Sequence, residues 1–292
     1  MSKNVLSFVL FGNGDRYWSA IPMSLISHKM AFPDFEIRMH LAKEVKEHWM
    51  FPLLYELKNK YGLIKIKNVD LDYRRTQPTL WRLKPLWSKN VRYVFCRDLD
   101  SLCGVSEIRA MRLFMAMDFW IHGIRSYKLH TINLMAGMCG FNVKELRRHS
   151  ILPDNFLDYQ RAVKPVVNGY RWGCDQFALK DFFYVKHPRK HFLMKKTLDT
   201  VLGDAPRRIG DFNATHLSKT LYRQVDIDYI PTPNMLETVK KLQPFAGAPI
   251  MGKDSVRHLG KALKMNTDMA SAIKEIFNKY PKIQNYYLLN ND

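Results

Sequence analysis

The chain has 292 residues, 47% hydrophobic and 13% aromatic, which supplies enough apolar material for a sizeable core and excludes global disorder. Its 46 lysines and arginines exceed its 27 aspartates and glutamates, and the net charge of +19 favours anionic partners such as nucleic acid, anionic lipid or phosphorylated substrates. The four cysteines form no C-x-x-C pair, which argues against a disulfide framework and for buried thiols in a reducing compartment.

Apolar runs and turn residues alternate along the first two thirds of the chain and predict an α/β domain. The expected strands cover 4–11, 35–41, 63–69 and 91–95, with a loop and strand at 122–140, and the expected helices cover 17–30, 45–61, 79–87, a segment from 106, and 177–185. We expect residues 1–215 to form this domain. Residues 216–292 are expected to be a linker and a helical C-terminal appendage packed on it, with a pair of amphipathic helices at 254–280.

Two carboxylates, Asp98 and Asp100, follow the buried strand at 91–95. Acids at the carboxyl end of a strand in an open α/β sheet are placed to meet a ligand. Side chains two residues apart on an extended chain lie roughly 6.6 Å apart, too far to hold one small cation together unless the chain turns at Ser101. Hard cations such as Mg²⁺ or Mn²⁺ suit carboxylates and complete their shell with substrate phosphates. The pattern is compatible with a divalent-metal site, and an exposed acidic turn is the alternative that the spacing alone leaves open.

Four other segments carry a pattern that belongs with Arg97–Ser101, and they are Phe8–Asn13, Thr79–Leu86, Ile132–Gly140 and Trp172–Gln176. Taken in this order, the five segments resemble a family of nucleotide-sugar-dependent glycosyltransferases with the GT-A fold and a D-x-D metal site. The resemblance runs from Asn4 to Tyr184, and Arg-Asp-x-Asp-Ser is its most specific part. Cys139 stands where that pattern has an aromatic residue.

The resemblance implies a GT-A-like fold, which is a Rossmann-like mixed sheet flanked by helices. It also implies a UDP- or GDP-type nucleotide-sugar donor, a glycan or other hydroxyl acceptor, and Mn²⁺ or Mg²⁺ as cofactor. Asp98 and Asp100 are the expected metal ligands. The expected nucleotide-sugar contacts are Phe11, Gly12, Asn13, Arg82, Arg97 and Leu99, and the expected acceptor or sugar pocket is His130, Ala136, Gly137, Trp172 and Gln176.

Arg82 and Asp175 have more specific expected roles, the first from the chemistry of its side chain and the second from the resemblance. Arg82 is expected to contact the nucleotide, because a guanidinium can fork two phosphate or base oxygens. Its alternative is an ion pair on a helix surface. Asp175 is the candidate to deprotonate or orient the acceptor hydroxyl, since the resemblance places an acid and an amide facing the reacting sugar carbon. The alternative for Asp175 is a helix N-cap.

The function that these residues favour is transfer of a hexosyl or pentosyl group from a nucleotide-diphosphate donor to a hydroxyl. A metal-dependent phosphohydrolase or nucleotidyltransferase is the first alternative, although such enzymes usually place more acids near the metal. A basic nucleic-acid-binding protein is the second, but the charges are spread and no zinc-finger or aromatic RNA-binding pattern accompanies them.

We expect no sequence-specific nucleic-acid binding, and the dense basic cluster at 186–196 allows contact with an anionic membrane. No apolar run approaches about 20 residues, and the N-terminal segment is short for a signal peptide, so a soluble cytoplasmic protein is expected.

Overall fold

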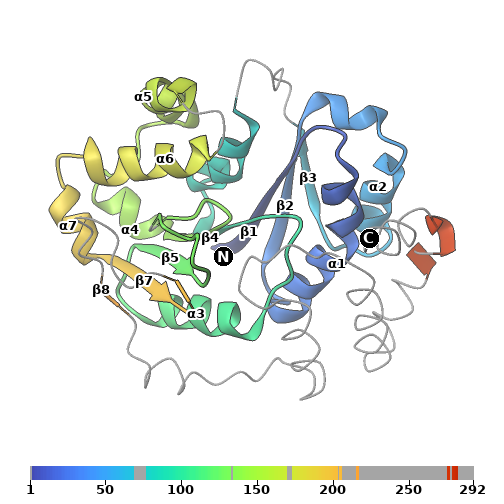
Figure 1. Cartoon of the computed structure of the whole chain (residues 1–292), viewed down its shortest axis with the longest axis horizontal. Coiled ribbons are helices and arrows are strands. Elements are labelled where there is room, and N and C mark those ends of the chain that lie inside the picture. The colour runs from blue at the N-terminus through green and yellow to red at the C-terminus, as the bar shows by residue number, and fades with distance from the viewer. Residues whose placement is uncertain are drawn as a thin grey trace.

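The computed structural model describes residues 2–68, 77–132, 134–169, 173–202, 204–205, 215–216, 275–276 and 278–281. Within these residues the strands form one sheet in the order β3-β2-β1-β4-β6-β5-β7-β8 (Figure 1). The strands are β1 (Lys3–Leu10), β2 (Glu36–Leu41), β3 (Lys65–Asn68), β4 (Val91–Arg97), β5 (Ile121–Arg125), β6 (Met138–Asn142), β7 (Thr197–Val201) and β8 (Thr215–His216).

The sheet is mixed, and β6 is the strand that runs against its neighbours. β1 lies parallel to β2 and β4, whereas β6 pairs antiparallel with both β4 and β5. The chain therefore leaves β1 and β4 at the same end of the sheet, and it enters β6 at that end because Arg97 pairs with Met138. This arrangement brings the ends of three central strands, far apart in sequence, close together.

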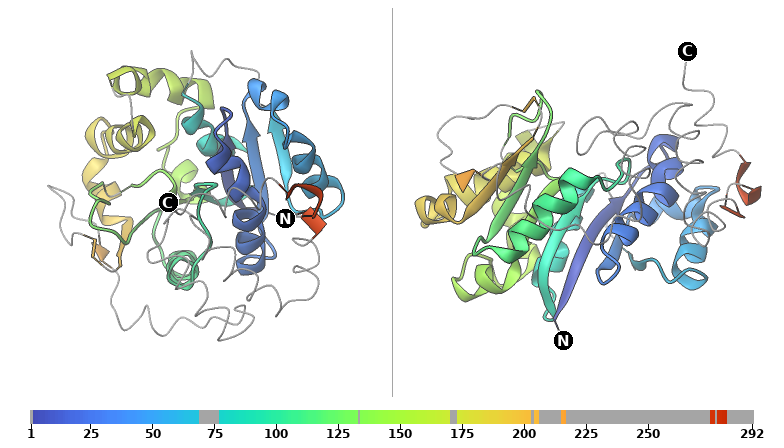
Figure 2. Two further views of the ribbon diagram at one scale, coloured as in Figure 1. Left: turned by 45° about the vertical axis from the view of Figure 1, so that its right-hand side comes forward. Right: turned by 90° about the horizontal axis from the view of Figure 1, so that it is seen from below.

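Helices cover both faces of the sheet (Figures 1 and 2). The α-helices are α1 (Asp15–Ala31), α2 (Phe51–Asn59), α3 (Val105–Ala116), α4 (Val143–Arg148), α5 (Phe156–Gly169), α6 (Cys174–Lys180) and α7 (Lys190–Lys195). The 3₁₀ helices are η1 (Lys43–Glu47) and η2 (Pro78–Trp87), and a π-helix, η3 (Asp181–Val185), continues α6.

Successive residues of the central strands point to opposite faces and so supply two separate cores. Leu6, Phe8 and Phe95 pack with α1, α2 and α3 on one face. Val5, Val9 and Val94 pack with η2, α4, α5 and α6 on the other. The prediction of a Rossmann-like mixed α/β sheet flanked by helices is confirmed by this arrangement.

Three predicted helices differ from the structure where proline or local geometry intervenes. The helix expected at 45–61 divides into η1 and α2, and Pro52 lies in the first turn of α2, where its missing N–H costs no hydrogen bond. The helix expected at 79–87 is the 3₁₀ helix η2, with Pro85 inside it. The helix expected at 177–185 begins earlier, at Cys174, and ends as the π-helix η3.

Most of the expected C-terminal appendage lies outside the described residues, including nearly all of the helix pair expected at 254–280. Two described residues near the end of that segment, Ile276 and Tyr280, are buried against the core formed with α1 and α2. The Tyr280 hydroxyl donates a 2.9 Å hydrogen bond to Glu56 of α2.

The four cysteines are buried and unpaired, as the sequence predicted. None of the helices in the described part of the chain combines the length and the apolar character needed to cross a lipid bilayer.

Candidate active site

A small hollow opens where β1 and β4 end. Four predicted site residues line it together: Phe11 from the end of β1, Arg82 from η2, and Asp98 and Leu99 from the end of β4. The hollow has a volume of about 80 Å³, the scale of a few water molecules, so a nucleotide sugar would place only part of its surface inside. Tyr17 and Thr79 complete the polar lining.

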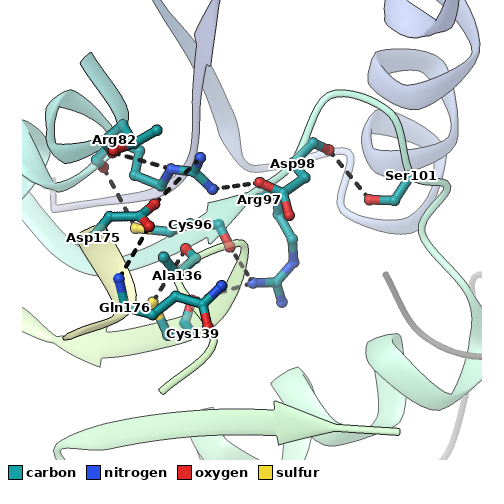
Figure 3. A network of polar contacts seen from close by, with 10 residues as sticks. Arg82, Cys96, Arg97, Asp98, Ser101, Ala136, Cys139, Asp175 and Gln176 are labelled. Carbon is teal, nitrogen blue, oxygen red and sulfur yellow. Dashed lines mark hydrogen bonds and ion pairs between the residues drawn. The ribbon is translucent and has the colours of Figure 1, made fainter. Parts of the chain in front are cut away.

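The backbone turns at the two acids of the D-x-D pair and is not extended there. Residues 99–100 form the turn, and the Ser101 hydroxyl donates a 3.2 Å hydrogen bond to the Asp98 carbonyl (Figure 3). The sequence required such a turn at Ser101 for one cation to be shared. The Asp98 side chain is 42% exposed and lines the hollow, whereas Asp100 is 6% exposed and does not line it.

Arg82 bridges two carboxylates from different parts of the chain. Its Nη1 lies 2.6 Å from Asp98 Oδ1 and its Nη2 lies 3.8 Å from Asp175 Oδ2 (Figure 3). Its Nε donates to the Thr79 carbonyl at 3.2 Å, which anchors the guanidinium to η2. Burial lowers the pKa of Arg82, but the negative charges of Asp98 and Asp175 outweigh burial and raise that pKa above its usual value. The guanidinium therefore stays charged between the two acids.

Asp175 lies in the first turn of α6 and is 7% exposed. Gly173, whose φ of 67° lies in the left-handed region that glycine adopts readily, occupies the N-cap position, so the N-cap alternative for Asp175 does not hold. The Asp175 carboxylate accepts a 3.0 Å hydrogen bond from the Gln176 backbone N–H. Burial raises the pKa of Asp175, the Arg82 charge lowers it and the Asp98 charge raises it, with a net upward shift.

Gly137 meets the D-x-D pair directly. A Cβ atom at this position would overlap the Asp98 carboxylate, so the absence of a side chain lets Asp98 pack against the loop before β6. Ala136, beside it, is buried and its carbonyl accepts from the Cys139 thiol at 3.5 Å. The space that the sequence assigned to a sugar or acceptor at Gly137 is thus occupied by the Asp98 side chain.

The loop after β1 is fixed from both sides. Gly12 has a φ of 70°, a conformation that glycine tolerates best, and its N–H donates to Glu44 at 3.3 Å. Its carbonyl accepts a 3.2 Å hydrogen bond from the Trp18 indole. Gly12 and the exposed Asn13 follow Phe11 directly, but they do not line the hollow.

Arg97 does not point toward the hollow. Its side chain is buried, forms an ion pair with Glu107 of α3, and donates to the carbonyl oxygens of Cys96 at 2.7 Å and Cys139 at 3.1 Å. Cys139 is itself buried in β6, where it lies opposite Cys96 of β4 in the strand pairing. Arg97 therefore ties the end of β4 to β6 and α3, and we assign it a positioning role in place of the expected nucleotide contact.

The remaining predicted pocket residues surround this centre unevenly. His130 is largely buried, and its Nδ1 accepts a 3.1 Å hydrogen bond from the Ser126 N–H. Burial and then the Arg125 charge lower the pKa of His130, while the Asp98 charge opposes them. Gln176 lies next to Asp175 in α6 (Figure 3). Trp172 lies outside the described residues.

A second group of metal-ligand types lies inside the protein. His28, Cys103 and Glu107 offer a nitrogen, a sulfur and an oxygen atom within 4.8 Å of one another. Such a mixed set is typical of zinc rather than of magnesium. However, Glu107 already pairs with Arg97, and burial raises the pKa of the Cys103 thiol well above its usual value, so the thiol stays protonated. This group is a buried ionic cluster, separate from the D-x-D pair.

Four residues that line the hollow were not expected from sequence: the apolar Val9 and Leu10, and the polar Thr79 and Tyr17. Thr79 stands at the start of a segment that carries the family pattern, and Tyr17 is the residue that breaks a G-x-G-x-x-G fingerprint after Gly12. Only the parallel pairing of β1 with β4, and the placement of η2 beside them, brings these residues to Asp98.

Comparisons with known proteins add little to this geometry. No protein-family profile matches the sequence, and no curated protein is significantly similar to it. Among solved structures, 4-diphosphocytidyl-2C-methyl-D-erythritol synthase from Anaerococcus prevotii aligns with 11% identity over 82% of this chain and 95% of that chain, at a TM-score of 0.38. A TM-score of 0.38 is too low to relate the two proteins in fold or in activity.

Proposed function

We propose that the chain is a metal-dependent glycosyltransferase that moves a sugar from a nucleotide-diphosphate donor to a hydroxyl acceptor. The observation that carries the proposal is the Arg82 bridge between Asp98 and Asp175. The sequence suggested a metal role for Asp98, a phosphate role for Arg82 and an acid–base role for Asp175. The bridge supports the proposal because transfer from a diphosphate donor needs these three functions beside one another.

The donor set fits the expected cofactor. Asp98 and Asp100 supply carboxylate oxygens, which Mg²⁺ and Mn²⁺ prefer, and the chain turns at residues 99–100, as sharing of one cation requires. The ion pair with Arg82 shows that the Asp98 carboxylate already holds a positive group. When bound, Mn²⁺ or Mg²⁺ would neutralise charge on the departing diphosphate, which is worth several kcal/mol of barrier.

Arg82 would act on both partners of the reaction. Its guanidinium pairs with the Asp98 carboxylate and orients it before a donor arrives. Once the Asp98 carboxylate is engaged elsewhere, the same planar group can donate to a phosphate oxygen of the donor. Phe11 and Leu99, on the walls of the same hollow, would contact the nucleotide, with Gly12 and Asn13 in the loop beside it.

We infer that Asp175 deprotonates or orients the acceptor hydroxyl. Its carboxylate is held by Arg82 and by the Gln176 N–H, so it is fixed in position while remaining next to the hollow. Because its pKa is raised, Asp175 would be a stronger base than an exposed aspartate. A base acts in its deprotonated form, so turnover should fall as the pH drops through this raised pKa.

The acceptor or sugar side of the site would be formed by the loop before β6 together with the start of α6. Ala136 and Gly137 approach from the loop, and Gln176 lies next to Asp175. His130 and Trp172 are proposed to belong to the same side. We propose no sequence-specific nucleic-acid partner.

The released product distinguishes the proposal from its rival. Incubation with UDP- and GDP-sugars and Mn²⁺ should release a nucleoside diphosphate, which an enzyme-coupled assay or ³¹P NMR detects. A nucleotidyltransferase would instead consume a nucleoside triphosphate and release pyrophosphate, and a phosphohydrolase would release phosphate. Pyrophosphate release from triphosphates, with every nucleotide sugar left intact, would replace the glycosyltransferase proposal with the nucleotidyltransferase alternative.

A further inference from the structure

A second hollow lies at the other end of the sheet from Asp98, near the start of β4. It has a volume of about 500 Å³ and is an open depression between the end of α4 and the loop that precedes α7, which lie beside each other in Figure 1. Its lining consists of Arg148, His149, Ser150, Pro188, Arg189, His191 and Phe192. Two arginines and two histidines therefore face this space, and among the described residues no acidic one lines it.

The topology separates this hollow from the candidate active site. α4 follows β6, whose last residue, Asn142, pairs with Tyr93 near the start of β4. Arg147 of α4 donates to the carbonyl oxygens of Leu86 and Ser88, just before β4 begins. Since Asp98 follows the last residue of β4, the two hollows lie at opposite ends of this strand.

The walls of the hollow are braced by a buried tryptophan. The His149 ring stacks on Trp120 with centroids 4.2 Å apart, and the Phe192 ring meets Trp120 edge-on at 4.8 Å. Arg189 donates a hydrogen bond to the His149 carbonyl, which ties the α7 loop to the end of α4. Ser150, with a φ of 52°, is the one non-glycine residue with positive φ in the described part of the chain. Such an outlier marks a conformation imposed by its surroundings.

The charge balance of the hollow favours an anion. Two acids lie close to it. Glu145 is 2.8 Å from Arg148 Nη2 and 3.9 Å from His149 Nε2, and the Asp118 carboxylate, which interacts with Arg148 and His149, pairs with Lys196 at 2.7 Å. Since Lys196 balances Asp118, the guanidiniums of Arg148 and Arg189 exceed the single charge of Glu145. Lys190 and Lys195 add positive charge nearby on α7. A planar guanidinium donates in pairs to phosphate oxygens, which makes arginine the preferred residue for binding such groups.

We propose that this basic hollow is a binding site for a phosphate-bearing ligand, independent of the candidate active site. The phosphate could belong to a free phosphorylated compound or to a lipid headgroup, and the chemistry of recognition is the same for both. The aromatic face of Phe192, 41% exposed, would contact the apolar part of the ligand next to the phosphate. This proposal holds whether or not the chain transfers sugars.

Calorimetry with sodium pyrophosphate in EDTA-containing buffer tests the proposal, because EDTA removes any metal that would recruit phosphate to Asp98 and Asp100. The double variant Arg148→Gln/Arg189→Gln should weaken binding about 100-fold, since each charge-assisted hydrogen bond is worth about tenfold or more. Arg148→Lys/Arg189→Lys keeps both charges but loses the paired donors, and it should fall in between. The matched control Lys58→Gln/Arg161→Gln removes the same net charge from exposed parts of α2 and α5.

Sedimentation with phosphatidic acid vesicles, against phosphatidylcholine vesicles, assigns the source of the phosphate. Vesicle binding that Arg148→Gln/Arg189→Gln abolishes and the control preserves, without pyrophosphate binding, supports a lipid headgroup. Pyrophosphate binding with the same dependence supports a free ligand. Equal losses in the arginine variant and the control, or no binding to either probe, would overturn the site. Preferential binding of a single-stranded oligonucleotide through the same arginines would overturn the assignment to a phosphorylated small molecule or headgroup.

Discussion

Two buried arginines, Arg97 and Arg82, flank the same strand end and work in different surroundings. The Arg97–Glu107 pair is almost fully buried on both sides, with side chains 0% and 1% exposed. Arg82 is also buried, but its partner Asp98 is 42% exposed and lines a hollow. The first pair can only hold the fold together. The second combines a fixed cation with a carboxylate that a ligand can reach, and this difference identifies the candidate site.

The largest expected effect comes from breaking the buried Arg97–Glu107 pair. Arg97→Met leaves the Glu107 carboxylate buried without its cation, so the free energy of unfolding should fall by about 3–5 kcal/mol in urea titrations. Arg82→Met should cost less stability, because water can reach Asp98 once the guanidinium is gone. The comparison between the two regions would be wrong if Arg82→Met proved the more destabilising of the two.

The next effect concerns the chemistry assigned to Asp175. Asp175→Asn keeps the size of the side chain but removes the base, so turnover should fall about 10²–10⁴-fold while the donor Kd stays within a few-fold. Asp158→Asn, on the solvent-facing side of α5, is the matched control and should leave turnover unchanged. Turnover of the Asp175 variant within a few-fold of normal would remove this residue from the reaction.

Gly137 tests whether the position of Asp98 matters. In Gly137→Ala the added methyl group displaces the Asp98 carboxylate, and a displacement of about 1 Å can cost about 10²-fold in turnover. In an Asp98→Ala background the Gly137→Ala change should cost almost nothing further, because the group it displaces is absent. Full additivity in this double-mutant cycle would contradict the contact.

The smallest expected effect is a pH dependence of stability that arises from His122, a buried residue outside the candidate site. Burial first, and then the Arg97 charge, lower the pKa of His122 to about 3. The unfolded chain binds a proton at this histidine below pH 6.5 and the folded chain does not, so stability falls as the pH drops from about 6.5 toward 3, by up to about 1.4 kcal/mol per pH unit.

His122→Gln, which keeps a group that can hydrogen-bond to the Thr200 hydroxyl, should remove this part of the pH dependence. Urea titrations at pH 7 and pH 5 measure it. An unchanged difference in stability between the two pH values in the variant would show that His122 is not responsible.

Local patterns in the sequence were sufficient for the order of the elements up to β4 and for the acids at its end, but they did not predict α4, α5, α7 or β7. The apolar run 91–95 predicted the strand, and its abrupt end predicted Asp98 at a sheet edge. The pairing of distant residues was out of reach. Whether Arg97 faces a ligand or Glu107 depends on how α3 packs against β4, and the bridge from Arg82 to Asp175 depends on where α6 lies. No local periodicity encodes either contact.

Proline and strand direction account for the other differences. Pro52 lies in the first turn of α2, where the helix restarts, and Pro85 lies inside the 3₁₀ helix η2; the antiparallel entry of β6 brings Gly137 against Asp98 without any signal in the loop itself. The sequence indicated Gly137 only as part of an acceptor or sugar pocket, and the three-dimensional arrangement places the Asp98 carboxylate against it.

The central claim is that Asp98 and Asp100 recruit a nucleotide diphosphate through a divalent cation. Titrating UDP and GDP into the protein by calorimetry, with Mn²⁺ and then with EDTA, tests it most directly, with Asp98→Asn and Asp100→Asn as the variants. We expect binding of one nucleotide with Mn²⁺ and its loss with EDTA or with either variant, since an amide cannot balance the charge of the cation. Binding that is equally tight in EDTA, or unchanged in both variants, would contradict the metal-dependent site.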